Sequence, residues 1–451
     1  MEIWKNLIDK RSKLFLFLFL VAFSLNAQSF HGLHSSSYFP LQRISNQPAD
    51  ILESRHKWQV NVVSAQLDIY KNNTLDDSWL GQLSNRLGIT NFKSIFSSSR
   101  ADYFLRTQII LPSAIYKPND KHAFALTTKL NGLGKFESTN SAFFDLLVGK
   151  LPNEFENING DFFKSVVNTW WEFKLSYAHK LYEDDDHKWT GGLSASVLSS
   201  LGSAYMELED ISAEFDEERI DHLGINVRYG LSDNVSKSIY EDKTNLMSSL
   251  GFSIDLGVNY IKKSSQARIP HEYKIGFSVT DIGHINNKQA TETALFSVNA
   301  ENIATRTFSN ISDITELIDT LNNLVNTNKI SGNSFRTNLP TNFMLASDFH
   351  LNDFWFLNAM IRQTLNPFRG LGEEIINLSE FMMSLTPRFE NEVFGAFLPI
   401  GYSSKRNFTV GTALKYRFIF VGSGNIWSSL INQDNGEREL YFGINIPIKP
   451  Y

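Results

Sequence analysis

The feature of this sequence that most constrains its fold is a repeated alternation of large apolar residues with small or polar ones. Successive side chains of a β-strand point to opposite faces, so this alternation predicts strands with one apolar and one polar face. It is clearest over residues 250–260, 408–418 and 440–448. In the last of these segments the apolar positions are Leu440, Phe442, Ile444, Ile446 and Ile448.

The length of these segments separates two kinds of β-sheet protein. They run for roughly ten residues, longer than ordinary strands, and end at turn-forming clusters such as residues 183–187 and 433–436. A strand that crosses hydrocarbon at a tilt needs about nine to eleven residues, and only a closed barrel leaves no unpaired edge in lipid. We therefore predict an all-β fold: a transmembrane antiparallel outer-membrane β-barrel of about 14 strands, within a range of roughly 12 to 16.

The first 27 residues have the features of a secretory signal peptide. Four basic residues precede an apolar run, residues 14–25, that is too short to span a bilayer. Ala27 is a small residue at the expected cleavage point, so we predict a mature chain that starts near Gln28. The alternative is an N-terminal membrane anchor. No later apolar run approaches the length of a membrane-spanning helix, and we expect an exported protein located in the outer membrane.

Composition excludes several classes of protein. The chain of 451 residues contains no cysteine, which excludes a disulfide scaffold, a thiolate zinc site and a lipid-anchored lipoprotein. A formal net charge of −6 argues against a nucleic-acid partner. The mean hydropathy of −0.21 resembles that of a soluble protein, but alternation explains it because half of each strand faces water. No linker or repeat divides the chain, so we expect one barrel rather than several domains.

Short segments spread over the mature sequence resemble one family when their order and spacing are taken together. The segments are residues 46–51, 251–257, 277–283, 339–342, 386–390 and 398–400. The family is a Bacteroidota group of outer-membrane β-barrels known as a domain of unknown function. It is distantly similar to long-chain fatty-acid-transporter and type IX secretion barrels. The resemblance implies an outer-membrane barrel and implies no reaction.

Two segments depart from the barrel pattern. Residues 312–328 carry apolar side chains at helical spacing, with Asp313 and Glu316 placed as a capping box, and predict an amphipathic helix. This helix would cover a loop or the barrel mouth, or would serve as a lid or a docking element. Residues 28–57 alternate poorly. They would either pack inside the barrel of residues 58–451 as a plug or simply lead into its first strand.

Motifs for catalysis and cofactor binding are missing. No Gly-x-Ser-x-Gly occurs, His271 is not followed by a histidine at the spacing of a zinc helix, and three Gly-x-Gly pairs lack the third glycine of a dinucleotide site. The acidic run of residues 183–186 lacks the spacing of a calcium loop and is better explained as a turn. We expect no catalytic residue, no metal, no cofactor and no enzymatic activity.

Charged residues on the polar faces of the strands are the candidate functional residues. The candidates for the lumen are Asp255, Arg388, Lys415 and Arg417. They would either brace the wall across its interior or form a solute-selective constriction. The candidates for contact with lipid are Ile254, Leu256, Leu414, Tyr416, Phe442, Ile444 and Ile446.

These features together favour passive transport or passage of a small or hydrophobic solute. The alternative is a non-conducting platform that docks secretion or surface proteins. The expected partners are outer-membrane lipid and the barrel assembly machinery, which reads aromatic-ended final strands such as the one that ends at Tyr451. We expect a monomer.

Overall fold

The computed structural model describes most of the chain. The described residues are 30, 32–71, 101–139, 156–232, 249–265, 271–288, 292–309, 314–324, 329–352, 354–365, 380–404, 407–431 and 438–450. The predicted signal peptide and its cleavage point therefore lie outside the described residues.

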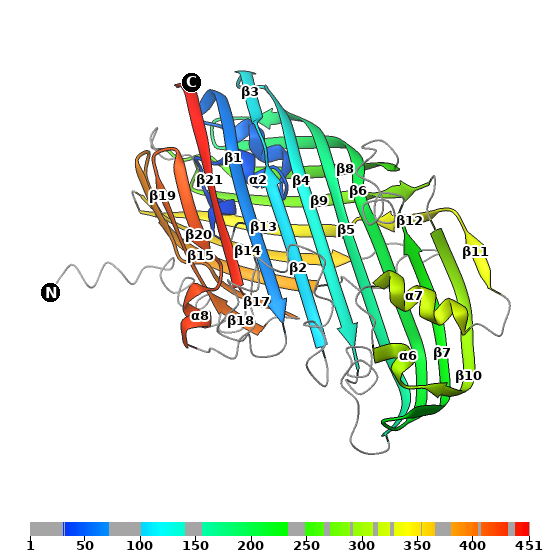
Figure 1. Ribbon diagram of the computed structural model, residues 1–451. Coiled ribbons are helices and arrows are strands. Elements are labelled where there is room, and N and C mark those ends of the chain that lie inside the picture. The colour runs from blue at the N-terminus through cyan, green and yellow to red at the C-terminus, as the bar shows by residue number, and fades with distance from the viewer. Residues whose placement is uncertain are drawn as a thin grey trace.

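One antiparallel sheet closes on itself to form a barrel (Figure 1). Closure is made by the first strand, β1 (His56–Lys71), which pairs with the last, β21 (Arg438–Pro450). The next strands are β2 (Ala101–Ile110), β3 (Ser113–Asn119), β4 (His122–Ser138), β5 (Glu156–Glu183), β6 (His187–Phe215), β7 (Arg219–Leu231), β8 (Ser249–Lys262), β9 (Tyr273–Asn287), β10 (Glu292–Ala304) and β11 (Ile330–Gly332). They are followed by β12 (Phe335–Asn338), β13 (Thr341–Asn352), β14 (Trp355–Leu365), β15 (Glu380–Glu390), β16 (Phe394–Phe397), β17 (Ile400–Ser403), β18 (Asn407–Val410), β19 (Thr412–Tyr416) and β20 (Ile419–Ser423).

The wall of the barrel consists of 14 strands, which confirms the predicted fold. Four of them are interrupted by short breaks, so that β2 continues into β3, β12 into β13, β16 into β17 and β18 into β19. Both halves of an interrupted strand pair with the same neighbour in three of these cases: β2 and β3 with β4, β12 and β13 with β9, and β16 and β17 with β15.

The two ends of the barrel differ. Tight turns at 119–122, 183–187, 352–355, 390–394 and 416–419 all lie at the end where β1 begins and β21 finishes. We call this the turn end, and the opposite one the loop end. At the turn after β5, Asp184 accepts backbone N–H groups of Asp186 and His187, so the acidic run is used to form a hairpin.

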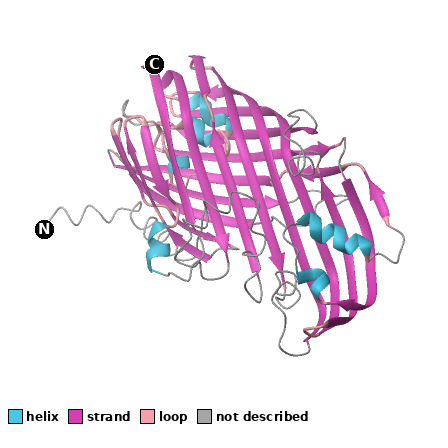
Figure 2. Ribbon diagram, in the orientation of Figure 1, coloured by secondary structure: helices cyan, strands magenta, loops and turns pink. Residues whose placement is uncertain are grey.

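Part of the sheet continues past the wall at the loop end. Residues 187–199 of β6 pair with β8 in the wall, whereas residues 204–215 pair with β7, which in turn pairs with β10. Two helices, α6 (Arg306–Ser309) and α7 (Ile314–Asn323), lie over this projecting sheet (Figures 1 and 2).

The predicted amphipathic helix thus exists as α7. Its apolar residues Leu317, Ile318 and Leu321 are buried in a hydrophobic core with the projecting strands. The helix covers this separate core rather than the barrel mouth. Asp313 of the expected capping box lies outside the described residues. None of the described helices is long and apolar enough to cross a membrane.

The outer face of the wall is apolar and the inner face is polar. On β8, Ile254 and Leu256 are exposed on the outside, whereas Ser253 and Asp255 between and beside them are buried within. The other residues expected to contact lipid follow the same alternation. Leu414, Tyr416, Phe442 and Ile446 are exposed on the outer face, and Ile444 is half-buried there.

Candidate functional site

Residues 32–55, which we call the inner segment, lie inside the barrel near the turn end (Figure 1). They form three short helices, η1 (Leu33–Ser35), α2 (Pro40–Arg43) and η2 (Pro48–Glu53). Pro40 and Pro48 each occupy the first turn of a helix, where the missing N–H has no intrahelical partner to lose. The prolines that break the strand pattern in the sequence therefore start helices here.

Apolar side chains of the inner segment pack against two parts of the wall. In one cluster, Leu33 and Phe39 of the segment, together with Phe30 just before it, pack against Phe420 of β20 and Tyr441 of β21. The other joins Leu41, Ile44, Ile51 and Leu52 to Ile115, Ala123, Ala125 and Ala178. The small alanines on β4 and β5 leave room for the segment. All of these side chains are buried, so the segment is packed as tightly as a protein core.

Glycines let the segment approach the backbone of the wall. Gly192 on β6 and Gly257 on β8 are paired in register, and a Cβ on either would collide with Gln47, Pro48 or Ala49. The Gln47 side-chain amide donates hydrogen bonds to the carbonyl oxygens of Val258 and Phe277, at 3.3 and 3.0 Å. Here the inner segment contacts the wall with no wall side chain between them.

Buried charges fix the segment to β6 and β9. Asp50 accepts from the Nε of Arg43 at 2.7 Å and from the Nζ of Lys274 at 3.0 Å. Glu53 accepts from the Nζ of Lys188 at 2.8 Å. Burial would raise the pKa of both carboxyls, but the neighbouring cations hold the pKa of Asp50 and that of Glu53 below their usual range.

A second group of buried charges joins the segment to β13 and β15. Arg388 donates to both carboxylate oxygens of Asp348 and also contacts Glu390. Glu390 accepts the backbone N–H of Ser37 at 2.9 Å and the hydroxyl of Ser36. Arg388, one of the predicted lumen charges, therefore lies inside the barrel, where it braces the wall and supports a contact of the inner segment.

Asp255 and Lys415 also point inward. Asp255 accepts from the Nζ of Lys174 and from the backbone N–H of Asp281. Lys415 lies at the turn end, where its Nζ is 3.7 Å from the centre of the Tyr38 ring. These contacts match a bracing network more closely than an open constriction.

The prediction for Arg417 is wrong. The strand that we expected over residues 408–418 breaks at Gly411 and ends at Tyr416, so Arg417 falls in the following turn. Its φ of 51° belongs to the left-handed region, which reverses the chain, and its side chain is exposed. The alternation that placed Arg417 in the lumen does not continue through this turn.

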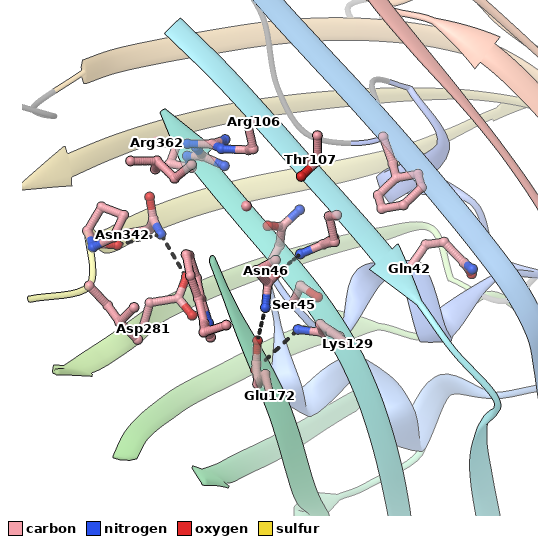
Figure 3. A pocket seen from close by; sticks show the side chains of 18 residues that line it. Gln42, Ser45, Asn46, Arg106, Thr107, Lys129, Glu172, Asp281, Asn342 and Arg362 are labelled. Atoms are coloured by element: carbon pink, nitrogen blue, oxygen red, sulfur yellow. Dashed lines mark hydrogen bonds and ion pairs between the residues drawn. The ribbon is translucent and has the colours of Figure 1, made fainter. Parts of the chain in front are cut away.

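A small cavity, lined by both polar and apolar side chains, remains on the loop-end side of the inner segment (Figure 3). Its volume is about 90 Å³, which is room for about three water molecules. The inner segment contributes Gln42, Ser45 and Asn46, and the wall contributes Arg106, Thr107, Lys129, Glu172, Asp281, Asn342 and Arg362.

The cavity wall carries fixed polar groups. Glu172 accepts from the Nζ of Lys129 at 3.4 Å and from the side-chain amide of Asn131 at 3.0 Å, while Asn342 donates to Asp281 at 3.1 Å. None of these cavity residues was among the predicted lumen charges. The inward direction of Glu172 could have been read from its place between apolar residues 171 and 173. Among the described residues, no group of three or more His, Asp or Glu is arranged to hold a metal ion.

The fold defines a closed β-barrel with a segment of its own chain packed against the inside of the wall. This chain belongs to the family described as "Family of unknown function (DUF5723)", whose model matches residues 48–424. A comparison with curated proteins gave no match.

Solved structures similar to the chain include a deltaS2S3 mutant of the TodX monoaromatic hydrocarbon channel, with 10% identity, 94% of this chain and 96% of that chain covered, and a TM-score of 0.47. The toluene transporter TodX of P. putida has 8% identity, with 91% and 94% covered and a TM-score of 0.46. A Pseudomonas aeruginosa FadL homologue has 11% identity, with 94% and 98% covered and a TM-score of 0.29.

Proposed function

We propose that this protein is an outer-membrane channel for a small solute and that the inner segment holds it closed. The observation that carries the proposal is the inner segment, which packs against the inside of a closed wall of 14 strands. Among the described residues, two cavities between the segment and the wall measure about 90 and 30 Å³. Each is small, so a solute larger than a few water molecules can pass here only if the segment moves.

The apolar outer face supports a place in the membrane. Large hydrophobic side chains are exposed on neighbouring strands around the wall, far more than a soluble monomer shows. Near the turn end, Trp58 stacks on Tyr116 and Trp189 packs on Tyr260, as expected for aromatic residues at a membrane interface. Short turns face the periplasm in bacterial barrels, so the turn end is the periplasmic one in this proposal.

The lining of the cavity narrows the solute class. Arg106, Lys129, Glu172, Asp281 and Arg362 present charged groups of both signs to the cavity, beside apolar side chains such as Phe30 and Trp170. An apolar solute would displace water from these charged groups at a cost in free energy, so the charges favour a hydrated solute. We therefore propose a small, polar solute that also contacts apolar side chains.

A second candidate function has its own observation. The projecting sheet with α6 and α7 has a separate hydrophobic core and stands beyond the wall at the loop end. Such a surface suits a platform that docks secretion or surface proteins without conducting.

Conductance of the reconstituted protein tests the proposal. The full chain in planar bilayers should be closed, and a variant without residues 32–53 should conduct and should admit a polar probe such as glycine or arabinose into liposomes. Heat-dependent gel migration would show that the variant still forms a barrel. A folded variant that stays closed would overturn the proposed channel function. Specific recovery of surface proteins with the full chain would then favour the docking platform.

A further inference from the structure

The helix α8 (Ile426–Ile431) is amphipathic in the reverse sense, with its apolar side turned away from the protein. The exposed fractions of Ile426, Trp427, Leu430 and Ile431 are 43%, 47%, 64% and 85%. These four residues are related by spacings of one and four, which places them on one face of a helix. Ser428 and Ser429, on the other face, are half-buried.

The serine face of α8 bonds to the wall. The hydroxyl of Ser428 accepts the backbone N–H of Val410 at 3.2 Å, an edge group of β18. On the apolar face, the indole N–H of Trp427 donates to the hydroxyl of Thr412 at 2.6 Å, which leaves no free polar group on the Trp427 side chain. At the start of the helix, the side chain of Asn425 accepts the backbone N–H of Glu439 at 3.1 Å. The helix is thus fixed to the strands on both sides of it.

These contacts place α8 where the wall lacks a strand. The short strand β20 pairs with residues 441–444 of β21 and ends at Ser423. Beyond that point towards the loop end, one edge of β21 pairs with β1, and one edge of β18 pairs with β17. The other edge of each strand faces α8. No strand among the described residues covers the two remaining edges, and α8 lies against both β18 and β21.

We propose that α8 replaces a strand in the barrel wall and that its apolar face is covered by the hydrocarbon of the outer leaflet. This inference rests on the proposed membrane location. The apolar outer face of the wall continues up to the helix, because Phe408 and Leu440 are exposed on β18 and β21, the two strands that α8 contacts. A helix satisfies its own backbone, so it closes a gap in lipid at a place where an unpaired strand edge would be costly. The acyl chains that cover the outer face of the neighbouring strands would therefore also cover the apolar face of α8.

Single cysteine variants test this, because the chain contains no cysteine of its own. Leu430→Cys and Ile431→Cys would carry an environment-sensitive NBD label in liposomes of phosphatidylcholine and phosphatidylglycerol. Leu414→Cys on the outer wall and Asp185→Cys in a turn serve as the lipid and water references. We expect labels at 430 and 431 to emit at the wavelength of the label at 414 and to be quenched several-fold more by nitroxide lipids than the label at 185.

A fifth variant tests the orientation of the helix. A label on Ser428→Cys should be quenched several-fold less than one on Leu430→Cys, since Ser428 faces the wall. Equal quenching at the two positions, or labels at 430 and 431 that behave like the one at 185, would overturn the inference and leave α8 open to a protein partner. A label at 414 that also behaves like the one at 185 would instead overturn the membrane location itself.

Discussion

The side chain of Gln47 occupies the space that a side chain at Gly257 would need. A Cβ at Gly257 would collide with the Gln47 amide, and the same holds for Gly192 and the backbone of Pro48 and Ala49. Glycine in a strand usually weakens it, but here it permits a close approach of two backbones. The fit between the inner segment and the wall therefore depends on glycine, which has no side chain, at positions 192 and 257 of the wall.

Substitution of Gly192 by alanine should displace the inner segment. The added methyl group meets the backbone at Pro48 and Ala49, which cannot rotate away, so we expect docking to weaken by about 1–3 kcal/mol. Hydrogen exchange at the backbone amides of residues 49–53 would measure this weakening. Gly134→Ala on β4 is the matched control, because its nearest neighbour, the Cβ of Leu105, is 3.7 Å away. Equal exchange in both variants would contradict a tight fit at Gly192.

Neutralisation of Asp50 should have a larger effect. Asp50→Asn leaves Arg43 and Lys274 buried without their anion, and removal of one partner from a buried pair costs about 3–5 kcal/mol. We expect protease sensitivity of the inner segment and the appearance of conductance. Asp185→Asn, in an exposed turn, should change neither. An inner segment as resistant in Asp50→Asn as in the parent would show that these charges do not hold it.

Acid should release the inner segment. The pKa values of Asp50 and Glu53 are lowered in the docked state, so both carboxylates favour docking at pH values above their ordinary pKa, near 4. This contribution is lost as the pH falls below about 4, when the docked carboxylates become protonated. Conductance measured between pH 6 and pH 3 would follow this loss of docking. Release that is complete above pH 5, or that is equally acid-dependent in an Asp50→Asn, Glu53→Gln variant, would exclude this cause.

An arginine on the outer wall should harm assembly. Leu256→Arg places a charge in the proposed hydrocarbon layer and should cost about 2–4 kcal/mol of folding free energy near the midplane. Leu295→Arg is the control, since Leu295 is similarly exposed, at 44% against 48%, but lies on β10 of the projecting sheet. Its cost should stay within about 0.5 kcal/mol. Urea unfolding in lipid vesicles gives both values, and similar losses would argue against a membrane around β8.

The wall was predictable from sequence because each strand carries its own signal. Alternation depends on residues two positions apart, so Leu256 and Phe442 could be assigned to the outer face without knowledge of their neighbours. The helix α7 was predictable for the same reason, at a spacing of three and four. The position of α7 on a projecting sheet was not predictable. The sequence of β6 contains no local signal that its second half extends beyond the wall and pairs with β7.

The inner segment shows the opposite case. Asp50 meets Lys274 across 224 residues of sequence, and Ser37 meets Glu390 across 353. No pattern within residues 28–57 specifies these partners, so the sequence alone favoured a plug only slightly over a simple leader into the first strand. The prediction for Arg417 was wrong for a third reason. The positive φ of Arg417 itself ends the alternation from which its inward direction was predicted.

The closed pairing of β1 with β21 has a consequence for how the lumen can open. The inner segment joins the wall at Ser54 and Arg55, directly before β1 at the turn end, and the wall around it has no free seam on this side. The segment can therefore swing out only towards the turn end. In the proposed orientation a solute from outside meets the closed face of the segment, whereas a periplasmic factor has access to its attachment. Opening would then be controlled from the periplasmic side rather than by the solute.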